Sequence, residues 1–352
     1  MICINCRFLS QQITGVQRYA IEICLQLKDF NEQIIFLSPP NIIHKNIAEK
    51  LDVKVIGKRS GYYWEQVELP RWLNKHSGGL LVNLCNMAPL LYHNNSITIH
   101  DIAVLKHKEW FSKKFYWFYN AVMPLLVKRA KKIFTVSEFS KSEIVSFFSI
   151  DPERIFIVNN AVSDAIYPND TSDRWGLIHK KYILAVSSIN PRKNFKTIIE
   201  AFNKMDADTD TYLIVAGETN KVFNRVDYMS AAEKNPKILF IGYVSDKELG
   251  FLYKNAIAFI YVSLYEGFGI PMLEAMSCGC PVIASNNTSM IEIGKNAALF
   301  VDPLNSEQLK NSIIQIANNA VLRDNLIKNG HLVNAEYKWK ESTKNLYQRL
   351  LS

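Results

Sequence analysis

The amino-acid sequence predicts an α/β protein made of two Rossmann-like domains, each a parallel sheet covered by helices. Short apolar, β-branched runs alternate with helix-patterned stretches along the chain, which is typical of parallel strands joined through helices. A polar stretch with proline and glycine, from Asp164 to His179, interrupts this alternation and is predicted to be a linker. The 352 residues also exceed the length of one typical core, so two domains are expected.

The first domain is predicted to span residues 1–165. Its strands are expected at Ile2–Ile4, Ile34–Leu37, Val53–Ile56, Leu80–Val82, Ile97–Ile99, Ile133–Val136 and Ile155–Val158. The second domain is predicted to span residues 166–337, with strands at Tyr182–Val186, Tyr212–Val215, Ile238–Ile241, Ala258–Ser263, Pro281–Ala284 and Ala298–Val301. The chain is helical from Ser306, and residues 338–352 are expected to pack back on the first domain. Parallel sheets bind ligands at the carboxyl ends of their strands, so two facing domains would enclose a cleft.

Composition and charge limit the class of protein. Hydrophobic residues make up 48% and charged residues 21%, which is ordinary for a globular protein. There is no apolar run of about 18 residues and no signal-peptide layout, so a cytoplasmic location is expected. The formal charge of +8 lies mostly in the first half and suits a phosphorylated substrate or anionic lipid. No nucleic acid is expected as a partner, because no recognised binding motif accompanies the charge.

Cysteines and aspartates suggest no metal site. Cys3 and Cys6 have a CxxC spacing, but no second pair completes a zinc site, so buried thiols are expected. Asp206-Ala207-Asp208 resembles a metal-binding Asp-x-Asp, yet it precedes a strand rather than following one. No metal and no other cofactor is therefore predicted.

The most informative stretch runs from Tyr265 to Glu274. It follows an apolar run and contains Pro271, which suits the first turn of a helix, so a strand, a turn and a helix are predicted. Gly267 and Gly269 allow the backbone to approach a ligand, and the helix N-terminus favours negative charge. Glu266 and Glu274 are the candidate functional carboxylates; a glycosidase acid and nucleophile pair is one alternative for them.

Two further segments lie between a predicted strand and a predicted helix. Arg192 and Lys193, after the strand that ends at Val186, could hold a diphosphate. Gly15 opens a helix that is predicted to reach about Leu27. At the end of another strand, His100 and Asp101 suit contact with sugar hydroxyls, and imidazole can transfer protons near neutral pH.

These motifs resemble those of the family-4 glycosyltransferases, retaining enzymes of the GT-B fold that transfer a sugar from a nucleotide donor. The resemblance implies that Glu274 binds the donor ribose, that Glu266 contacts the donor sugar, and that Lys193 neutralises the leaving diphosphate. It also implies donor contacts for the following residues: Gly267, Phe268, Gly269, Ile270 and Gly15. Many members carry an arginine where this chain has Ser187 and Ser188, which leaves Ser188 and Arg192 as candidates for that phosphate contact.

The resemblance implies that His100 contacts the donor sugar or the acceptor and is a third candidate catalytic residue beside Glu266 and Lys193. It implies acceptor-side roles for Asp101 and Arg18. It implies transfer of a sugar, first of all mannose from GDP-mannose, to a glycan or polyprenyl-diphosphate-linked glycan in O-antigen, capsule or other surface polysaccharide synthesis. Two alternatives stay open: a nucleotide-sugar 2-epimerase on the same fold, and a non-catalytic subunit that only binds nucleotide or lipid.

A basic and aromatic stretch spans residues 106–132. Lysines interleaved with aromatic rings suit peripheral contact with the cytoplasmic face of the inner membrane, where the rings lie among lipid headgroups. Alternatively, the aromatic residues face the core of the first domain and the lysines face water. The sequence favours neither interpretation.

Overall fold

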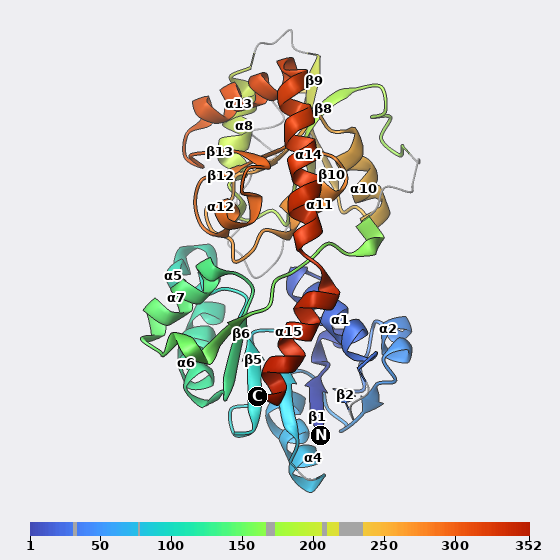
Figure 1. The fold of residues 1–352 in the computed structure, drawn as a ribbon, viewed down its shortest axis with the longest axis vertical. Coiled ribbons are helices and arrows are strands. Elements are labelled where there is room, and N and C mark those ends of the chain that lie inside the picture. The colour runs from blue at the N-terminus through green and yellow to red at the C-terminus, as the bar shows by residue number, and fades with distance from the viewer. Residues whose placement is uncertain (31–33, 77, 167–172, 206–209, 218–234) are drawn as a thin grey trace. The chain divides into compact units, whose positions relative to one another are not determined.

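The computed structural model describes residues 1–352 except 31–33, 77, 167–172, 206–209 and 218–234, and the chain forms two compact units (Figure 1). Unit 1 comprises Met1–Ile102, Trp117–Asn160 and Lys338–Ser352, and unit 2 comprises Ala103–Tyr116 and Ala161–Tyr337. The sequence placed residues 103–116 in the first domain and the boundary at 165. In unit 2 the ring of His107 packs edge-on against Tyr265, with 5.4 Å between centroids, which helps to explain why residues 103–116 belong there.

Unit 1 is a parallel sheet of seven strands in the order β3-β2-β1-β4-β5-β6-β7. The strands are β1 (Ile2–Asn5), β2 (Ile34–Ser38), β3 (Lys54–Val55), β4 (Leu80–Asn83), β5 (Asn95–Thr98), β6 (Lys132–Thr135) and β7 (Ile155–Ile157). Its helices are α1 (Gly15–Leu27), α2 (Lys45–Lys50), α3 (Gly61–Tyr63), α4 (Leu69–Lys75), most of α6 (Lys113–Arg129), α7 (Glu138–Phe148) and α15 (Trp339–Leu351). A π-helical segment, η2 (Trp64–Glu68), joins α3 to α4.

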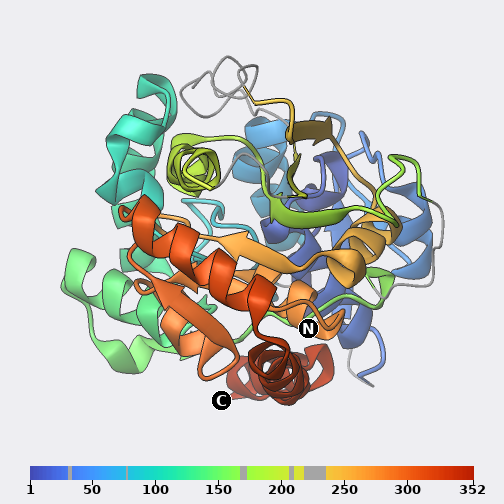
Figure 2. The ribbon, with the colours of Figure 1, turned by 90° about the horizontal axis from the view of Figure 1, so that it is seen from above.

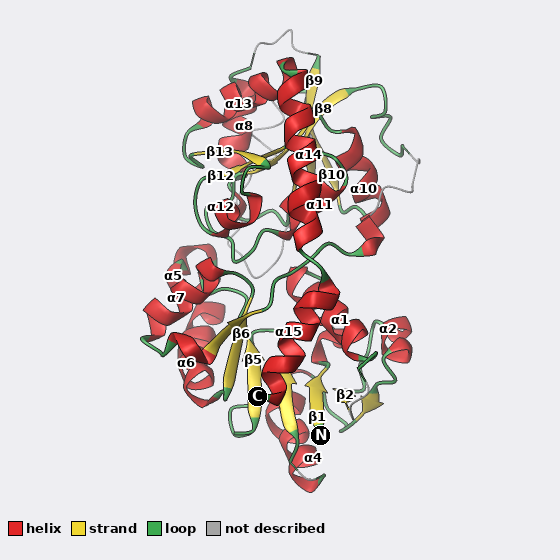
Figure 3. Ribbon diagram, viewed as in Figure 1, coloured by secondary structure: helices red, strands yellow, loops and turns green. Residues whose placement is uncertain are grey.

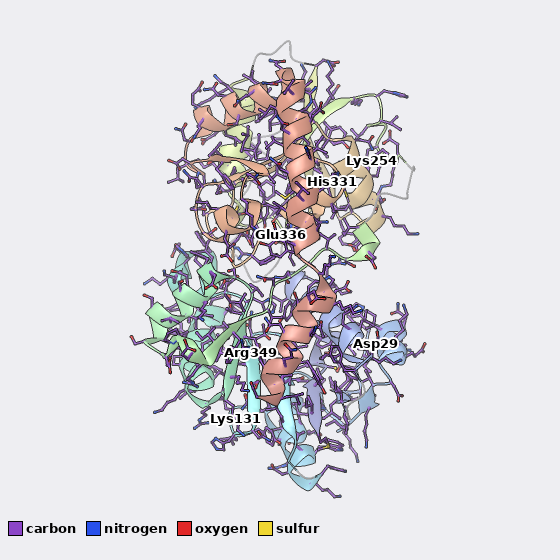
Figure 4. The ribbon with its side chains drawn as sticks, viewed as in Figure 1. Asp29, Lys131, Lys254, His331, Glu336 and Arg349 are labelled. Carbon is purple, nitrogen blue, oxygen red and sulfur yellow. The ribbon has the colours of Figure 1, made fainter. Side chains whose placement is uncertain are left out.

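The C-terminal helix α15 is part of unit 1 and packs on α1. Its buried face includes Trp339 and Leu346, and Trp339 lies edge-on to Tyr19, with 5.9 Å between ring centroids. Near its end, the ammonium of Lys132 donates a hydrogen bond to the carbonyl of Arg349, which Figure 4 labels. The helix is therefore held at both ends by residues from the start and middle of the chain.

Unit 2 is a parallel sheet of six strands in the order β10-β9-β8-β11-β12-β13. The strands are β8 (Lys181–Val186), β9 (Thr211–Ala216), β10 (Ile238–Gly242), β11 (Ala258–Tyr261), β12 (Val282–Ser285) and β13 (Ala298–Val301). The described helices are α5 (Ala103–Lys106), α8 (Phe195–Asn203), α10 (Asp246–Asn255), α11 (Ile270–Ser277), α12 (Ser289–Gly294), α13 (Ser306–Asn318) and α14 (Ala320–Glu336), coloured as helix in Figure 3.

Helices cover both faces of the unit 2 sheet, as the view in Figure 2 shows. Successive strand side chains point to opposite faces. On one face Ile183 and Ile260 pack with α8 and α13, and on the other the hydroxyl of Tyr182 donates to the carbonyl of Leu252 in α10, at 2.8 Å. Because both faces are covered, the strands are almost wholly apolar, which is why they were visible in the sequence.

The thirteen strands of the described residues lie where the sequence predicts them, apart from ends that differ by one or two residues. The start of α1 at Gly15 and of α13 at Ser306 is confirmed as well. In each sheet the chain order reverses once, between β1 and β4 in unit 1 and between β8 and β11 in unit 2. Open parallel sheets bind their ligands beyond the carboxyl ends of the strands at such switch points.

Candidate active site

The turn between β11 and α11 holds Glu266, and α11 itself holds Glu274, the two carboxylates that the sequence predicts to be functional. β11 ends at Tyr261, and α11 begins at Ile270 with Pro271 in its first turn, so the predicted strand, turn and helix are confirmed. Gly269 caps the helix with φ of 94°, a left-handed conformation that other residues avoid. Residues 265–269 are all buried, so the turn packs within the unit rather than standing out from its surface.

Glu266 and Lys193 form a buried ion pair at the switch point of unit 2. The ammonium of Lys193 donates to Oε1 of Glu266 at 2.5 Å, and the two side chains are 9% and 8% exposed. The guanidinium of Arg192 lies 3.9 Å from Oε2 of the same carboxylate. Glu266 follows β11 and Lys193 follows β8, and these strands are paired neighbours. Two motifs far apart in the sequence thus meet at one place.

The cations decide the charge state of Glu266. Burial would raise the pKa of this carboxyl, because the carboxylate loses hydration. The charges of Arg192 and Lys193 outweigh that effect and hold the pKa below its ordinary value. Glu266 is therefore ionised at neutral pH, which does not suit the general acid of a glycosidase. Its charge in turn compensates that of Lys193, so a diphosphate beside this pair would also need Arg192 or backbone N–H donors.

Tyr261 also belongs to this site, although the sequence predicts it only as part of a strand. Its hydroxyl accepts a hydrogen bond from the ammonium of Lys193 at 2.8 Å. Burial first, and then the charge of Glu266, raise the pKa of Tyr261 well above its usual range, so the hydroxyl stays protonated. The signal that could have found it is positional, since Tyr261 is the last residue of a strand beside the switch point.

The loop that carries Arg192 and Lys193 is anchored by Asn194. This residue has φ of 58°, and its amide donates to the carbonyls of Val262, at 3.0 Å, and Pro303, at 2.6 Å. The N–H of Leu264 donates to the carbonyl of Arg192 at 2.8 Å. The two loops that follow β8 and β11 are therefore bonded to each other, which fixes the cations next to Glu266.

Glu274 lies in α11 and is buried. The hydroxyl of Tyr253 in α10 donates to its Oε2 at 3.2 Å. Burial and then the charge of Glu274 raise the pKa of Tyr253 well above its ordinary value, which keeps Tyr253 as the donor of this bond. The contact orients the carboxylate, and its predicted part in ribose binding stays a prediction.

The remaining candidates of unit 2 lie around the same two loops. Gly267 and Phe268 are buried, Ile270 is half-buried, and Phe268 packs edge-on against Tyr337, with 5.6 Å between centroids. Ser188 is exposed, and the amide of Asn190 donates to its carbonyl at 2.8 Å and to its hydroxyl at 3.1 Å. Ser188 therefore helps to order the loop, and its predicted phosphate contact stays a prediction.

His100, predicted as an acceptor-side or catalytic residue, lies in unit 1 and is 7% exposed. Its Nε2 donates to the carbonyl of Leu84 at 3.0 Å, and its ring is edge-on to Tyr19. Burial lowers the pKa of His100, so the ring is neutral at neutral pH. With a hydrogen on Nε2, Nδ1 is the nitrogen able to accept a hydrogen bond or a proton.

Gly15, Arg18 and Asp101 also belong to unit 1. Gly15 is exposed at the first position of α1, where Thr14 and Gln17 form a capping box, and Arg18 lies one turn further along, half-buried. Asp101, next to His100, is half-buried as well. These positions suit contacts with a ligand, and the predicted roles stay predictions.

Within the described part of the chain, no group of three or more His, Cys, Asp or Glu side chains could hold a metal ion. Cys3 and Cys6 are buried free thiols, whereas Asp206 and Asp208 lie outside the described residues.

None of the described helices combines the length and apolar composition needed to cross a bilayer. In the stretch 106–132, Trp110 is buried and Trp117 is 65% exposed, so its aromatic residues do not all face a core, and membrane contact stays a prediction.

Comparisons with known proteins connect this geometry to a family. Residues 172–333 match the model of glycosyl transferases group 1. Over 258 residues the chain is 31% identical to an O-antigen chain mannosyltransferase B of Escherichia coli, covering 70% of this chain and 67% of that protein. It is 29% identical over 333 residues to the O-antigen chain mannosyltransferase RfbU of Salmonella typhimurium, covering 89% of this chain and 90% of that protein. The structure of HepE from Anabaena in complex with UDP-glucose has a TM-score of 0.79 at 16% identity, covering 99% and 98% of the two chains, which shows a shared fold.

Proposed function

The chain belongs to the group 1 glycosyl transferases and is a glycosyltransferase of the GT-B fold, and from this premise we propose that it transfers mannose from GDP-mannose to a surface glycan such as O-antigen. The names of the two bacterial relatives support the sugar and the pathway. The observation that best supports the proposed reaction is the Lys193–Glu266 ion pair at the switch point of unit 2.

The proposed reaction retains the configuration at the anomeric carbon. The bond from this carbon to the donor diphosphate breaks, and the acceptor oxygen attacks from the same face. The acceptor proton passes to an oxygen of the departing phosphate, so no protein nucleophile is needed. Arg192 and Lys193 stabilise the leaving diphosphate, and the ionised Glu266 both positions Lys193 and accepts hydrogen bonds from the donor sugar.

The donor nucleotide is proposed to lie over the turn before α11. Glu274 would accept hydrogen bonds from the ribose hydroxyls, and the N–H groups of Gly267 to Ile270 would approach the sugar and phosphates. A deep pocket for the base is not required for this assignment, since the ribose and diphosphate contacts are common to all nucleotide sugars. With two cations and a helix N-terminus at the diphosphate, we propose that no divalent metal is needed, and transfer is expected to persist in EDTA.

We propose a lipid-linked acceptor that the enzyme reaches by peripheral membrane contact. The exposed side of α6 supports this, because it combines Trp117 with Lys113, Lys114, Lys128 and Arg129. Aromatic rings and basic side chains together favour the surface of an anionic bilayer. Sedimentation of the protein with vesicles containing phosphatidylglycerol, but not with neutral phosphatidylcholine vesicles, is the expected result, and a W117S variant should sediment less.

Thermal-shift measurements with GDP-mannose, UDP-glucose, ADP-glucose, CDP-glucose and TDP-glucose test the donor. A bound donor stabilises the fold by mass action, so GDP-mannose should give the largest shift. Incubation of the stabilising donor with and without mannose-terminated acceptors then tests the reaction. A larger shift with another donor would replace GDP-mannose, whereas isomerised donor formed without acceptor would identify an epimerase instead.

A further inference from the structure

The switch point of unit 1 carries a second polar cluster that the sequence motifs did not reveal. Asn5 ends β1 and Asn83 ends β4, the two strands between which the chain order reverses. The amide of Asn5 donates to Oδ1 of Asn83 at 3.0 Å. Both side chains are almost fully buried, at 5% and 1% exposure, although asparagine is usually exposed. Polar side chains buried at this position of a doubly wound sheet point to ligand binding.

The cluster is organised around Glu65. Its Oε1 accepts hydrogen bonds from Asn5 Nδ2 at 2.8 Å and from Arg7 Nε at 3.1 Å. The side chain of Glu65 is 2% exposed and that of Arg7 is 11% exposed, so this is a buried ion pair. Glu65 lies in the π-helical segment η2, and π-helical turns inside α-helices occur frequently at functional sites.

The second oxygen of Glu65 has no hydrogen-bond partner among the residues that the structure describes. Oε2 is buried and makes no hydrogen bond within unit 1 as described, although a buried carboxylate oxygen normally has one. Glu65 lines a small hollow together with the following residues: Asn5, Arg7, Gln11, Cys85 and Met87. The free space is about 10 Å³, which fits one water molecule or one hydroxyl group but not a sugar ring.

The residues around the hollow restrict which chemical group of a ligand could bind there. A carboxylate oxygen accepts and does not donate hydrogen bonds, so the incoming group must be a donor. An anionic group is disfavoured, because the charge of Arg7 is already matched by Glu65. Next to the pair, the 44% exposed ring of Tyr62 packs under the Arg7 guanidinium, at 4.8 Å from its centroid. An exposed aromatic ring beside a hydroxyl acceptor is suited to the apolar face and one hydroxyl of a sugar.

We propose that Glu65 is an acceptor-binding residue: one hydroxyl of the terminal sugar of the acceptor glycan enters the hollow and donates to Glu65 Oε2, while the sugar ring lies against Tyr62. The inference rests on the proposed function, since it assigns the acceptor of that reaction. Arg7 and Asn5 are positioning residues, which hold Oε1 and leave Oε2 as the oxygen of Glu65 that can accept a further hydrogen bond.

Steady-state kinetics of the full chain with GDP-mannose and mannose-terminated oligosaccharide test the proposal. Glu65→Gln keeps the size of the side chain and weakens one acceptor, so the acceptor KM should rise about tenfold while the donor KM stays unchanged. Gln11→Trp, at the half-buried rim of the hollow, should raise the acceptor KM without touching the ion pair. The matched control is Glu68→Gln, because Glu68 lies in the same segment but bonds to the backbone of Lys58 and Arg59.

Slow hydrolysis of GDP-mannose without acceptor separates this proposal from the proposed function. Unchanged hydrolysis in the Glu65→Gln variant together with a raised acceptor KM supports the assignment. An acceptor KM within twofold of wild type in both hollow variants overturns it and leaves the hollow as a water site. If the wild type uses no GDP-mannose, the proposed function is wrong, and the assignment of Glu65 needs a separate test. NMR would then measure the binding of methyl α-mannoside to the wild type and to Glu65→Gln. Equal affinities of the two proteins would overturn the assignment.

Discussion

Replacement of Lys193 by methionine tests the ion pair on which the candidate active site depends. The two side chains are less than a tenth exposed, so the variant leaves Glu266 as a buried carboxylate whose nearest cation is the Arg192 guanidinium, at 3.9 Å. Removal of one partner from a buried pair typically costs about 3–5 kcal/mol. Because Arg192 remains, we expect the free energy of unfolding at pH 7 to fall by about 3 kcal/mol, at the lower end of this range.

The loss should depend on pH in a defined direction. In the wild type the lowered pKa of Glu266 contributes stability above the ordinary carboxyl pKa, and this contribution disappears as the pH falls through the folded-state pKa. In the variant the pKa of Glu266 rises, because burial is then opposed mainly by Arg192. The carboxyl can take up a proton when the pH is lowered, so the difference between variant and wild type should shrink from pH 7 to about pH 4.5.

Urea unfolding at both pH values, followed by circular dichroism, measures this difference. Lys196→Met is the control, because Lys196 is 77% exposed and its pair with Glu200 is a surface contact worth less than about 0.5 kcal/mol. A loss for Lys193→Met no larger than that of the control, or an equal loss at both pH values, would refute the reasoning. In the assay of transfer, the same variant should lower turnover more than donor affinity, since Lys193 is proposed to act on the leaving group.

Three other predictions concern the same unit. Tyr261→Phe removes the hydroxyl that Lys193 contacts but keeps the ring, so stability should fall by about 1 kcal/mol, with a lower kcat; an unchanged kcat would remove Tyr261 from the site. Glu274→Ala should weaken GDP binding at least tenfold in calorimetry through lost ribose hydrogen bonds, and equal affinity would contradict its assignment. Gly269→Ala should cost about 1–2 kcal/mol in thermal unfolding, because its φ of 94° strains any other residue; a smaller loss would show that the turn relaxes.

The sequence predicted the sheets well for a physical reason. Strands buried on both faces are nearly continuous apolar runs, so β8 and β11 are visible without any knowledge of their neighbours. The turn after β11 was also predictable, because glycine and proline have specific backbone preferences. Glu266 could be selected because it lies in that turn, and Arg192 and Lys193 because they are two adjacent cations between a predicted strand and a predicted helix.

The partners of these residues could not be predicted locally. Tyr261 looks like any aromatic residue of a strand, and only the pairing of β8 with β11 brings its hydroxyl to Lys193. Glu65 is even harder to select from the sequence, since it lies in a helical stretch with no motif. Its hydrogen-bond partner Asn5 is 60 residues away in the sequence. The grouping of residues 103–116 with unit 2 likewise depends on tertiary contacts that leave no periodic pattern.

The place of α15 has a consequence for the order in which the enzyme is completed during translation. Unit 2 is contiguous from Ala161 to Tyr337 apart from one short segment made earlier, so all of its strands leave the ribosome before α15 is synthesised. Unit 1 begins first but lacks its last helix until then, and the surface around Tyr19 that Trp339 covers stays open meanwhile. Unit 1 is thus begun first but completed last, because its final helix is synthesised after every residue of unit 2. A chain cut short before residue 338 would contain every strand of unit 2 but would lack the helix that covers Tyr19 in unit 1.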